Sequence, residues 1–562
     1  MKNKIFLLAV AAAGMSLMTG CMKEFSPQTS YVSKDQAAEA PNSFQGFVDG
    51  ITSTMVGKIL YNSKYPFDFG YPSFFLMRDV MGQDIVIDDA GHWFSTWYTC
   101  STGLGPRYAI CQYPWTIYYS WIKNCNTVIS LAGDTPSEAQ RAGVGIAYAM
   151  RAFYYMDLAR MFACKTYALD KNAETVPYIS DKTTPAEMAN NPRATNEVMW
   201  GKIIEDLNKA EEFLTGYERK DKTTPDLSVV YGLKARAYQV MEDWPNAENY
   251  AKLAQKGYTP MNEQQYLDRA TAFNTPNDSW MLYMQHKATD DVFVSNDADG
   301  SWGSFMFLEV NGSQCGYASS YGYQLSIDRH LYETIPATDF RKKCFVDFAI
   351  DGLATPEDKI EALKAYSDYA DDVYYSGYGG GPNKTGAVGS KAVGGFSLKF
   401  RAAGGAEGHS NQYIGFNCAV PLMRVEEMQL IEIEAAGMQD ESRGKTLLEA
   451  FAKTRDSKFE YGKHHDTYYN QSTSAFQNEV WWQRRVELWG EGFATFDIKR
   501  LNKGIIRSYA NTNHLETFRW NVQTPPDWMN LCIVETETMN NTACTNNPTP
   551  IAPTADSEEY IW

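Results

Sequence analysis

The chain has 562 residues, with 51 basic and 68 acidic side chains, so its formal net charge is −17 at pH 7. A surface of this sign repels phosphate backbones, which argues against a nucleic-acid-binding protein. The hydrophobic content of 44% and the charged content of 21% are those of an ordinary globular protein. Ten cysteines spread over so long a chain do not form a disulfide scaffold.

The first twenty residues have the pattern of an export signal. Lys2 and Lys4 are followed by an apolar run over residues 5–15, which is too short to span a bilayer and has the length of a signal-peptide core. No later segment of the sequence is apolar enough to cross a membrane. The sequence therefore predicts that residues 1–20 are a signal peptide.

A single cysteine stands directly after this signal. The segment "MTGC", which ends at Cys21, resembles a bacterial lipobox, and this resemblance implies that Cys21 becomes the first mature residue and carries acyl chains such as palmitate. An ordinary signal peptide with an incidental cysteine is the alternative. Residues 21–40 are rich in Ser, Gln, Lys and Glu and indicate a flexible tether, so a single ligand-binding domain is expected over residues 41–562.

The first half of this domain is predicted to be helical. Apolar residues recur at steps of three and four over residues 147–161 and again over residues 199–214, which indicates two amphipathic helices, each with one buried stripe. Residues 231–258 place small and bulky side chains at the spacing of a tetratricopeptide repeat, with Pro245 in the turn between the two helices. A chance helical hairpin is the alternative. Residues 424–457 resemble a second, looser copy.

Between these two hairpins the chain changes character. From about residue 274 to residue 417 it is rich in Gly, Ser, Asp, Tyr and Trp, in stretches such as "SNDADGSWGSF" and "GYASSYGYQL" that cannot form regular helices. Long loops inside a compact protein are usually functional or disordered, and the aromatic content argues against disorder. A large loop-rich insertion is therefore expected here.

One short pattern in this insertion suggests a metal. Ser295, Asp297 and Asp299 alternate before Gly300, as in a calcium-binding loop, but Met306 stands at the twelfth position, where a bidentate glutamate belongs. A structural calcium ion is therefore an alternative to the main expectation, which is that the protein uses no metal or cofactor.

Two carboxylates near the C-terminus are the best candidates for paired acid–base chemistry. Glu487 and Glu491 are spaced to share one helical face, as two glycosidase carboxylates could be. Three arginines and an aspartate surround them, and guanidinium forks bind carboxylates bidentately and can lock chain segments together. We therefore predict a structural ion-pair cluster and no enzyme activity. The predicted cluster consists of Arg484, Arg485, Glu487, Glu491, Asp497 and Arg500.

The same segment resembles the C-terminal signature of the SusD/RagB family, surface glycan-binding lipoproteins of Bacteroidetes. The family pattern is roughly Arg-Arg-x-Glu-Leu, then Glu-Gly, then Asp-Leu-x-Arg, and this chain departs from it through Ile498 in place of the last leucine. A second resemblance is the preceding helix, "PLMRVEEMQLIEIEAA", where Met428 replaces the customary tyrosine. Further matches are "WTIYYSWIKNCN", "AMRAFYYMDLARMF" and "TDFRKK", so the resemblance covers nearly the whole mature chain.

This resemblance implies a mainly α fold, in which four tetratricopeptide-like helical hairpins form a superhelical scaffold that carries a large loop-rich lobe. It implies a lipid-anchored protein exposed at the cell surface on the outer membrane. It also implies a partner, a SusC-like TonB-dependent transporter that the lipoprotein covers as a lid. No catalysis is implied. Most ligands of the family are glycans, and some members bind peptides.

Aromatic side chains in polar loops are the candidates for a ligand platform, because sugar rings present flat C–H faces to aromatic rings. The candidates are Trp93, Trp97 and Tyr98 in "GHWFSTWYTC", and Trp302, Tyr317, Tyr321 and Tyr323 in the inserted lobe. The alternative for each ring is a place in the core. Capture of an extracellular oligosaccharide for import is the leading functional hypothesis. Oligopeptide capture and surface hydrolysis are the others.

Overall fold

The computed structural model describes residues 43–57, 61, 65–87, 92–100, 103–290, 300–311, 324–377, 392–464 and 473–562. The chain divides into two units, Met1–Gly46 and Phe47–Trp562, and only the start of helix α3 (Ser43–Ser53) is described in the first unit. The predicted signal peptide, the tether and Cys21 lie outside the described residues, so they stay predictions. Everything below concerns the second unit.

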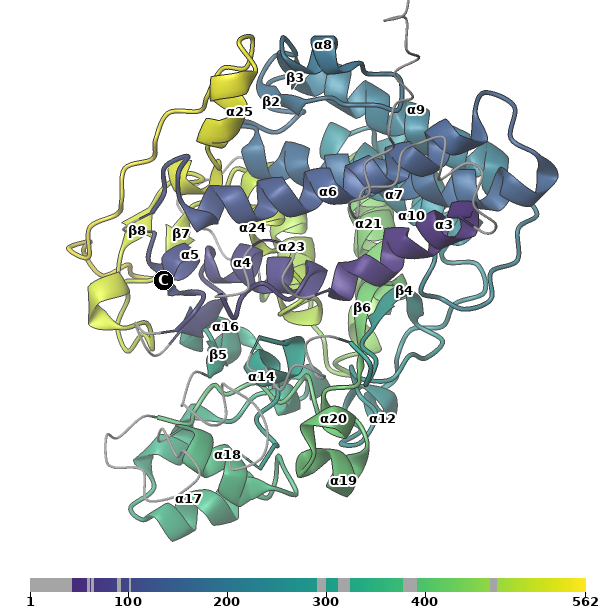
Figure 1. Cartoon of the computed structure of the whole chain (residues 1–562). Helices are drawn as coiled ribbons and strands as arrows, with labels where there is room; N and C mark the ends of the chain where they lie inside the picture. Colours follow the sequence, from purple (N-terminus) through teal and green to yellow (C-terminus); the bar gives the residue numbers. More distant parts are fainter. Residues whose placement is uncertain are drawn as a thin grey trace, which may run out of the picture. The chain divides into compact units, whose positions relative to one another are not determined.

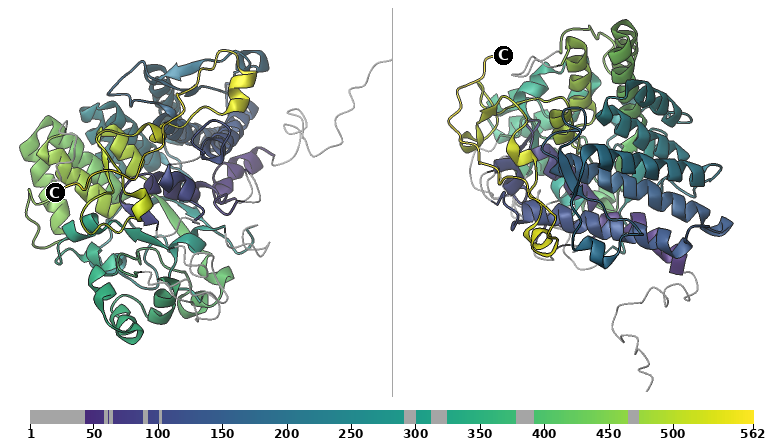
Figure 2. Two further views of the ribbon diagram at one scale, coloured as in Figure 1. Left: turned by 90° about the vertical axis from the view of Figure 1, so that its left-hand side faces the viewer. Right: turned by 90° about the horizontal axis from the view of Figure 1, so that it is seen from above.

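Long helices form the scaffold of this unit (Figure 1). Helix α6 packs against α7, α7 against α9, α9 against α10, α10 against α11, α11 against α21, and α21 against α22 and α23. Figure 2 shows the same helices from above as neighbouring rows. The predicted mainly helical scaffold of tetratricopeptide-like hairpins is thus confirmed. Its helices are α6 (Ala109–Ala132), α7 (Glu138–Phe162), α9 (Asn196–Leu214), α10 (Leu227–Met241), α11 (Trp244–Ala254), α21 (Val425–Gln439), α22 (Glu441–Lys453) and α23 (Ala475–Glu487).

The hairpin predicted over residues 231–258 consists of α10 and α11. Small side chains lie where the two helices meet, which lets their backbones approach closely. The side chain of Asp243 caps α11 by accepting a hydrogen bond from the backbone N–H of Asn246. Pro245 lies in the first turn of α11 and not in the turn before it, because a missing N–H is tolerated there. The alanines of the hairpin with no exposed surface are Ala235, Ala237, Ala247, Ala251 and Ala254.

Helix α7 is buried on almost every side, which corrects the prediction of a single buried stripe. From Gly143 to Phe162 only Tyr148 and Arg160 are partly exposed. Helices α6 and α9 both pack on α7, and the C-terminal segment reaches its last turn, where the backbone N–H of Leu531 donates to the carbonyl of Met161. A helix that is apolar around its whole circumference belongs inside a protein.

The loop-rich insertion leaves and re-enters the scaffold on two adjacent strands. Strands β4 (Trp280–Gln285) and β6 (Ala419–Arg424) pair antiparallel. The lobe between them has a small core of its own, which includes Leu308, Val346 and Phe396, and it lies below the helices in Figure 1. Its short elements are α14 (Trp302–Met306), β5 (Leu325–Ile327), α16 (Arg329–Thr334), η2 (Phe340–Cys344), η3 (Phe348–Gly352), α17 (Pro356–Leu363), α18 (Ala370–Gly377), α19 (Gly405–His409) and α20 (Gln412–Gly415).

Helix α14 falls within a stretch that was predicted to contain no regular helix. The hydroxyl of Ser301 accepts a hydrogen bond from the backbone N–H of Ser304 at 3.2 Å and so caps the helix. A single capped turn forms here because Trp302 and Phe305 bury their rings completely, or nearly so, in the core below. The glycine-rich composition conceals this short apolar segment.

The remaining elements are short. Within the described residues the strands pair only two at a time, β1 with β5, β2 with β3, β4 with β6 and β7 with β8. No helix of these residues has the length and hydrophobicity needed to cross a bilayer. The elements not yet named are η1 (Thr54–Val56), α4 (Tyr71–Val80), β1 (Ile85–Ile87), α5 (Ser95–Thr99), β2 (Glu174–Pro177), α8 (Pro185–Met188), β3 (Arg193–Thr195), α12 (Glu263–Tyr266), α24 (Ala494–Arg500), β7 (Ile505–Ile506), η4 (Glu516–Phe518), β8 (Asn521–Val522), η5 (Asp527–Met529) and α25 (Glu535–Asn540).

Candidate functional site

The structure divides the aromatic residues predicted to bind ligand into three groups. Trp97, Tyr98 and Trp302 have 0% of their surface exposed, so they are core residues, which corrects the expectation that they form an exposed platform. Trp93 is half-buried. The other candidates lie outside the described residues and stay predictions: Tyr317, Tyr321 and Tyr323.

Contacts with other rings account for the burial of the two tryptophans. Trp97 meets Phe67 edge to face, with the ring centroids 4.9 Å apart. Trp302 meets Phe400 in the same way at 5.1 Å. Such pairs add about 0.5–1.5 kcal/mol to the gain from burying the rings. Beside Trp97 the polar neighbours Ser95, Thr96 and Thr99 stay half-buried, whereas Ser301 and Ser304 beside Trp302 are buried with the ring.

The two predicted segments do come together, but through buried rings. Phe94, beside helix α5, packs edge to face on Phe305 of α14, with the centroids 5.2 Å apart. Phe305 also stacks on Phe69 at 5.7 Å. The two segments therefore meet through rings that were not among the predicted ligand-binding residues.

An aromatic row that precedes α5 escapes prediction from the sequence. Tyr65 is half-buried and stacks on Phe67 with a centroid distance of 5.0 Å and an interplanar angle of 9°. Phe67 in turn touches Trp97, and Tyr61 stacks on Tyr65 with the centroids 6.4 Å apart, so Tyr65 belongs to a stack that leads into the core. The alternation of aromatic residues at positions 65, 67, 69 and 71 is the signal that could have identified it. Tyr61, Tyr65 and Trp93 are described, partly accessible rings of this region.

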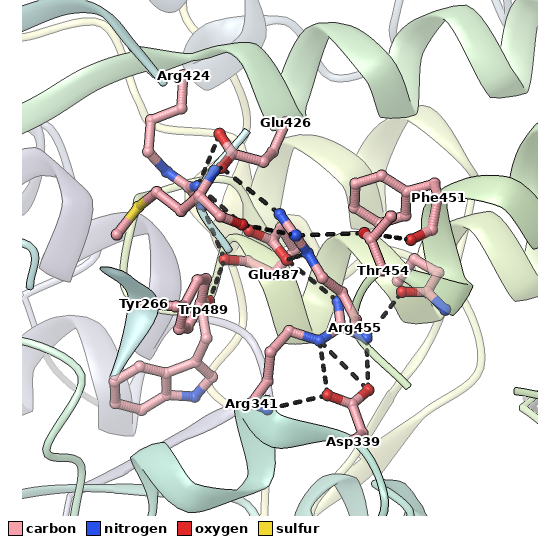
Figure 3. A network of polar contacts seen from close by, with 12 residues as sticks. Tyr266, Asp339, Arg341, Arg424, Glu426, Phe451, Thr454, Arg455, Glu487 and Trp489 are labelled. Carbon is pink, nitrogen blue, oxygen red and sulfur yellow. Dashed lines mark hydrogen bonds and ion pairs between the residues drawn. The ribbon is translucent and has the colours of Figure 1, made fainter. Parts of the chain in front are cut away.

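Glu487 is the centre of a buried network of charges (Figure 3). Its carboxylate lies 3.2 Å from Arg341 Nη1, 3.2 Å from Arg424 Nη1 and 3.1 Å from Arg455 Nε. Burial alone would raise the pKa of Glu487, but the three guanidinium groups outweigh burial and hold this pKa well below its usual value. Arg341 lies in η2, Arg424 ends β6, and Arg455 follows α22, so one carboxylate ties three distant segments together.

Glu491 continues the network on one side. Lys399 Nζ lies 2.7 Å from Glu491 Oε1 and also donates to the backbone carbonyls of Glu487 and Trp489, at 2.9 Å and 2.8 Å. Burial would raise the pKa of Glu491, but Arg424 and Lys399 keep this pKa below its usual value. The lysine satisfies all three of its donors in this way, which lets it remain buried.

The arginines of the predicted cluster find their partners both inside and outside it. Asp497 pairs with Arg484 and, at 3.2 Å, with Arg500 inside the cluster, while Arg485 and Arg500 also reach carboxylates that the prediction did not include. Carboxylates from α21 and from the segment before β1 take part, so the cluster joins parts of the chain that are far apart in sequence. Its arginine pairs, each at 2.6 Å, are Arg484 with Asp497, Arg485 with Asp84, and Arg500 with Glu434.

This arrangement offers no room for a substrate. The two cavities that touch the cluster measure about 20 Å³ and about 10 Å³, which is space for about one water molecule each. Glu487 and Glu491 are both engaged by arginine and lysine, so neither carboxylate is presented to solvent as a nucleophile or as a base.

The described residues contain no cluster of three or more His, Cys, Asp or Glu side chains that could hold a metal ion. The calcium-like pattern cannot be judged from this, because Ser295, Asp297 and Asp299 lie outside the described residues. A structural calcium ion at that position therefore stays a prediction.

Two family models match the chain. A SusD-like model described as starch-binding and associating with the outer membrane matches residues 85–239, and the SusD family model matches residues 241–550. Together they span the scaffold, the inserted lobe and the ion-pair cluster. No curated protein matches the chain.

Solved structures share the fold. A SusD-like carbohydrate binding protein from Bacteroides vulgatus matches with a TM-score of 0.66 at 20% identity, over 92% of this chain and 98% of that chain. A SusD superfamily protein from Bacteroides thetaiotaomicron has a TM-score of 0.62 at 17% identity, over 92% and 100% of the two chains. Surface glycan-binding protein A from Bacteroides thetaiotaomicron, solved in complex with laminarihexaose, has a TM-score of 0.61 at 17% identity, over 91% and 99%. At these identities the similarity shows the fold alone.

Proposed function

This chain belongs to the SusD family, and we propose that it binds an extracellular oligosaccharide and delivers it to a SusC-like TonB-dependent transporter for import. The observation that carries this proposal is the match of the two family models to residues 85–239 and 241–550. The similar solved structures include a SusD-like carbohydrate binding protein, a surface glycan-binding protein in complex with laminarihexaose and a laminarin binding SusD-like protein, which supports a glycan over a peptide.

The chemistry of the described surface is compatible with a glycan ligand. Tyr65 and Trp93 are half-buried, and a ring held in this way can offer an apolar face to the C–H groups of a sugar. The stack of Tyr65 on Phe67 leads into the α5–α14 core, so the ring is fixed before a ligand arrives, and a fixed ring lowers the entropy cost of binding.

We further propose that the chain is a binding protein without hydrolase activity. The support is the engagement of Glu487 and Glu491 by arginine and lysine side chains, together with the small size of the adjoining cavities. A glycosidase needs one carboxyl group free to protonate the leaving oxygen and another free to attack or to activate water.

We propose that Cys21 anchors the mature chain to the outer membrane, with the body facing the medium. The support is the lipobox-like segment and the description of the first family model, which names association with the outer membrane. Two acyl chains suffice for stable anchoring, and the tether over residues 21–40 would hold the body near a transporter.

Calorimetry with the mature chain tests the binding proposal. The panel should contain neutral oligosaccharides such as laminarihexaose, maltohexaose and xylohexaose, an acidic oligogalacturonide, and a mixture of oligopeptides. We expect binding of at least one oligosaccharide and no release of reducing ends on long incubation. Binding of peptides alone would replace the proposal with oligopeptide capture. Release of reducing ends would refute the proposal that the chain has no hydrolase activity. Affinity purification from the native cells in mild detergent should also recover a large outer-membrane barrel.

A further inference from the structure

The connection between β2 and β3 is much longer than a hairpin needs. The two strands pair antiparallel, and such strands are commonly joined by about two to five residues. Here the connection runs from residue 178 to residue 192 and carries the short helix α8. Long ordered connections in a compact unit usually have a function, so this one requires an explanation beyond joining two strands.

The start of this connection is held rigidly by the helices beneath it. The hydroxyl of Tyr155, on α7, donates to the carbonyl of Ile179 at 2.8 Å and accepts from the N–H of the same residue at 2.7 Å. The amide of Asn126, on α6, donates to that carbonyl as well, at 3.1 Å. One backbone unit is thus fixed by side chains of two scaffold helices.

Its two ends are also tied together. The side-chain amide of Asn191 donates to the carbonyl of Tyr178 at 2.9 Å, so the connection closes on itself. The amide of Asn541, beyond α25, donates to the carbonyl of Asn191 at 2.6 Å. Asp181 makes a buried ion pair with Arg151 at 3.0 Å. A loop anchored at so many points does not have to be ordered by a ligand, which makes it suitable for binding.

This anchored loop surrounds an open hollow of about 640 Å³. That volume falls within the range of about 300–1,000 Å³ that is usual for small-molecule sites. The hollow lies at α8, at the upper end of the unit in Figure 1 and in the left view of Figure 2, whereas α17 and the inserted lobe lie at the lower end. It is lined by Tyr178, Ser180, Lys182, Thr183, Ala186, Glu187, Asn190 and Asn191.

The lining combines one aromatic ring with many hydrogen-bonding groups. Tyr178 is half-buried. Its ring packs on Tyr155 with a centroid distance of 4.8 Å, and the guanidinium of Arg151 lies over the ring at 5.9 Å from its centroid, so both neighbours hold it in place. Two hydroxyl side chains and two amides belong to the same lining. The accessible part of an aromatic ring among hydroxyls and amides matches the alternating C–H and O–H surfaces of a sugar.

The charges of the lining are already compensated. Lys182 Nζ lies 2.7 Å from the carboxylate of Asp134, and Glu187 accepts hydrogen bonds at 2.8 Å from the backbone N–H and the hydroxyl of Thr184. The lining contains one cation and one anion and so has no net charge of its own. It therefore lacks the surplus of positive charge that would select an acidic ligand.

We propose that this hollow is a second glycan-binding site, separate from the region of Tyr65 and Trp93. It would bind a short uncharged segment of an oligosaccharide. The inference rests on the proposed function. Two separate sites on one unit would let a single chain hold a long polysaccharide at two points, and this raises the overall affinity without any improvement at either site.

Calorimetry with matched variants tests the inference. The probe is the neutral hexasaccharide, among laminarihexaose, maltohexaose and xylohexaose, that the mature chain binds. We expect two binding events in the wild-type chain and the loss of one in Tyr178→Ala. Tyr178→Phe should retain both, because the ring face remains. The control is Tyr167→Ala, which removes another half-buried tyrosine, one that contacts Lys171 and does not line the hollow.

A gel that contains the parent polysaccharide provides a second readout. Retention of Tyr178→Ala should weaken by about tenfold in apparent affinity, the effect of losing one modest aromatic anchor. Asn190→Ala removes an exposed side chain and should weaken retention as well, so a folding failure of Tyr178→Ala would not leave the inference undecided. Melting temperatures of all variants identify such a failure.

The possible outcomes separate the two proposals. If Trp93→Ala abolishes all binding while Tyr178→Ala and Asn190→Ala bind like the wild type, the inference is overturned and the proposed function stands. If the wild-type chain binds no oligosaccharide, both are overturned. If an oligogalacturonide occupies the hollow in preference to every neutral hexasaccharide, the assignment of an uncharged ligand is wrong.

Discussion

The carboxylate of Asp79 accepts a hydrogen bond from the backbone N–H of Gly492 at 2.8 Å. Asp79 is on α4, and Gly492 belongs to the C-terminal signature, so this bond joins two parts of the unit that are 413 residues apart in sequence. The same carboxylate accepts from the N–H of Ala494 at 3.0 Å, in the first turn of α24. The ionisation of Asp79 and the backbone conformation of Gly492 should therefore both affect the stability of the protein.

The stability of the protein should fall as pH rises because of Asp79. Burial raises the pKa of Asp79 from 3.8 to about 7, although its hydrogen bonds with Ala494 and Gly492 oppose this. A folded-state pKa above the unfolded value gives stability that is fully present below about pH 3.8 and is lost as pH rises through about 7. Urea unfolding at pH 5 and pH 8 should show this loss in the wild type, and Asp79→Asn should reduce it. An equal loss in the variant would assign the effect to other groups.

Gly492→Ala should destabilise the protein strongly. Gly492 has a φ of +80°, and a Cβ placed on it would lie 2.8 Å from Phe75 Cα, a backbone atom that cannot move aside. The positive φ alone costs about 1–2 kcal/mol for a residue with a side chain, and the clash adds to it. Chemical unfolding measures the loss.

The matched control is Gly201→Ala on α9. A Cβ at Gly201 would meet nothing within 4 Å, and alanine is about 1 kcal/mol better than glycine in a helix, so this substitution should stabilise. The two substitutions are chemically identical and should have opposite signs. Equal effects would show that the space and backbone angle at Gly492 do not decide the outcome.

Glu487→Gln should lower the free energy of unfolding by about 3–5 kcal/mol, because it leaves three guanidinium groups without their shared buried counter-charge. The amide keeps the shape of the side chain, so the change tests charge and not packing. Glu449→Gln is the control, since Glu449 pairs with Lys453 at the surface at 3.0 Å and such pairs contribute at most about 1 kcal/mol. A similar small loss in both variants would contradict a central role for Glu487.

The sequence predicts that the C-terminal signature forms ion pairs, but it does not identify the partners of Glu487. Mixed charges at this density indicate ion pairs, and the structure contains them. The partners of Glu487 come from residues 341, 424 and 455, and no local pattern connects these positions. Side chains far apart in sequence meet only when the whole scaffold has packed, so such partners could not be predicted from spacing.

Patterns of small residues were more informative than patterns of aromatic residues. The alanines of α10 and α11 predicted a close helical contact because only small side chains permit one. Trp97 and Trp302 lie in polar, glycine-containing stretches whose composition is the same whether the ring faces water or the core. The direction of a ring depends on the neighbours that it finds, here Phe67 and Phe400, and the local sequence does not contain them.

Replacement of Cys21 by alanine should release the protein from the membrane fraction. An acylated N-terminal cysteine is the expected anchor, and each buried methylene of its chains contributes about 0.8 kcal/mol to membrane binding. Mass spectrometry of the mature N-terminus should find acyl chains on Cys21. Cys164→Ala, which replaces another accessible cysteine, is the control and should leave the protein in membranes. Recovery of the Cys21 variant from membranes, with an unacylated wild-type N-terminus, would contradict the anchor.

Alanine at Trp97 and alanine at Trp93 should have different consequences, although the two tryptophans are four residues apart. Trp97 has no exposed surface and packs on Phe67, so Trp97→Ala should cost about 3–5 kcal/mol of unfolding free energy. Trp93 is half-buried and should cost much less. Trp93→Ala should instead weaken binding of the oligosaccharide by about tenfold or more, as the loss of an aromatic anchor does.

Affinity and unfolding must be measured on the same two variants, because a loss of folded protein can look like a loss of binding. Trp97→Ala corrected for its folded fraction should bind almost normally, and Trp93→Ala should remain folded while it binds weakly. If Trp93→Ala binds like the wild type, the ring that meets the ligand is another one. Tyr65 is then the next to replace, because it is a half-buried ring of the stack that passes through Phe67 to Trp97 and its removal leaves the buried rings in place.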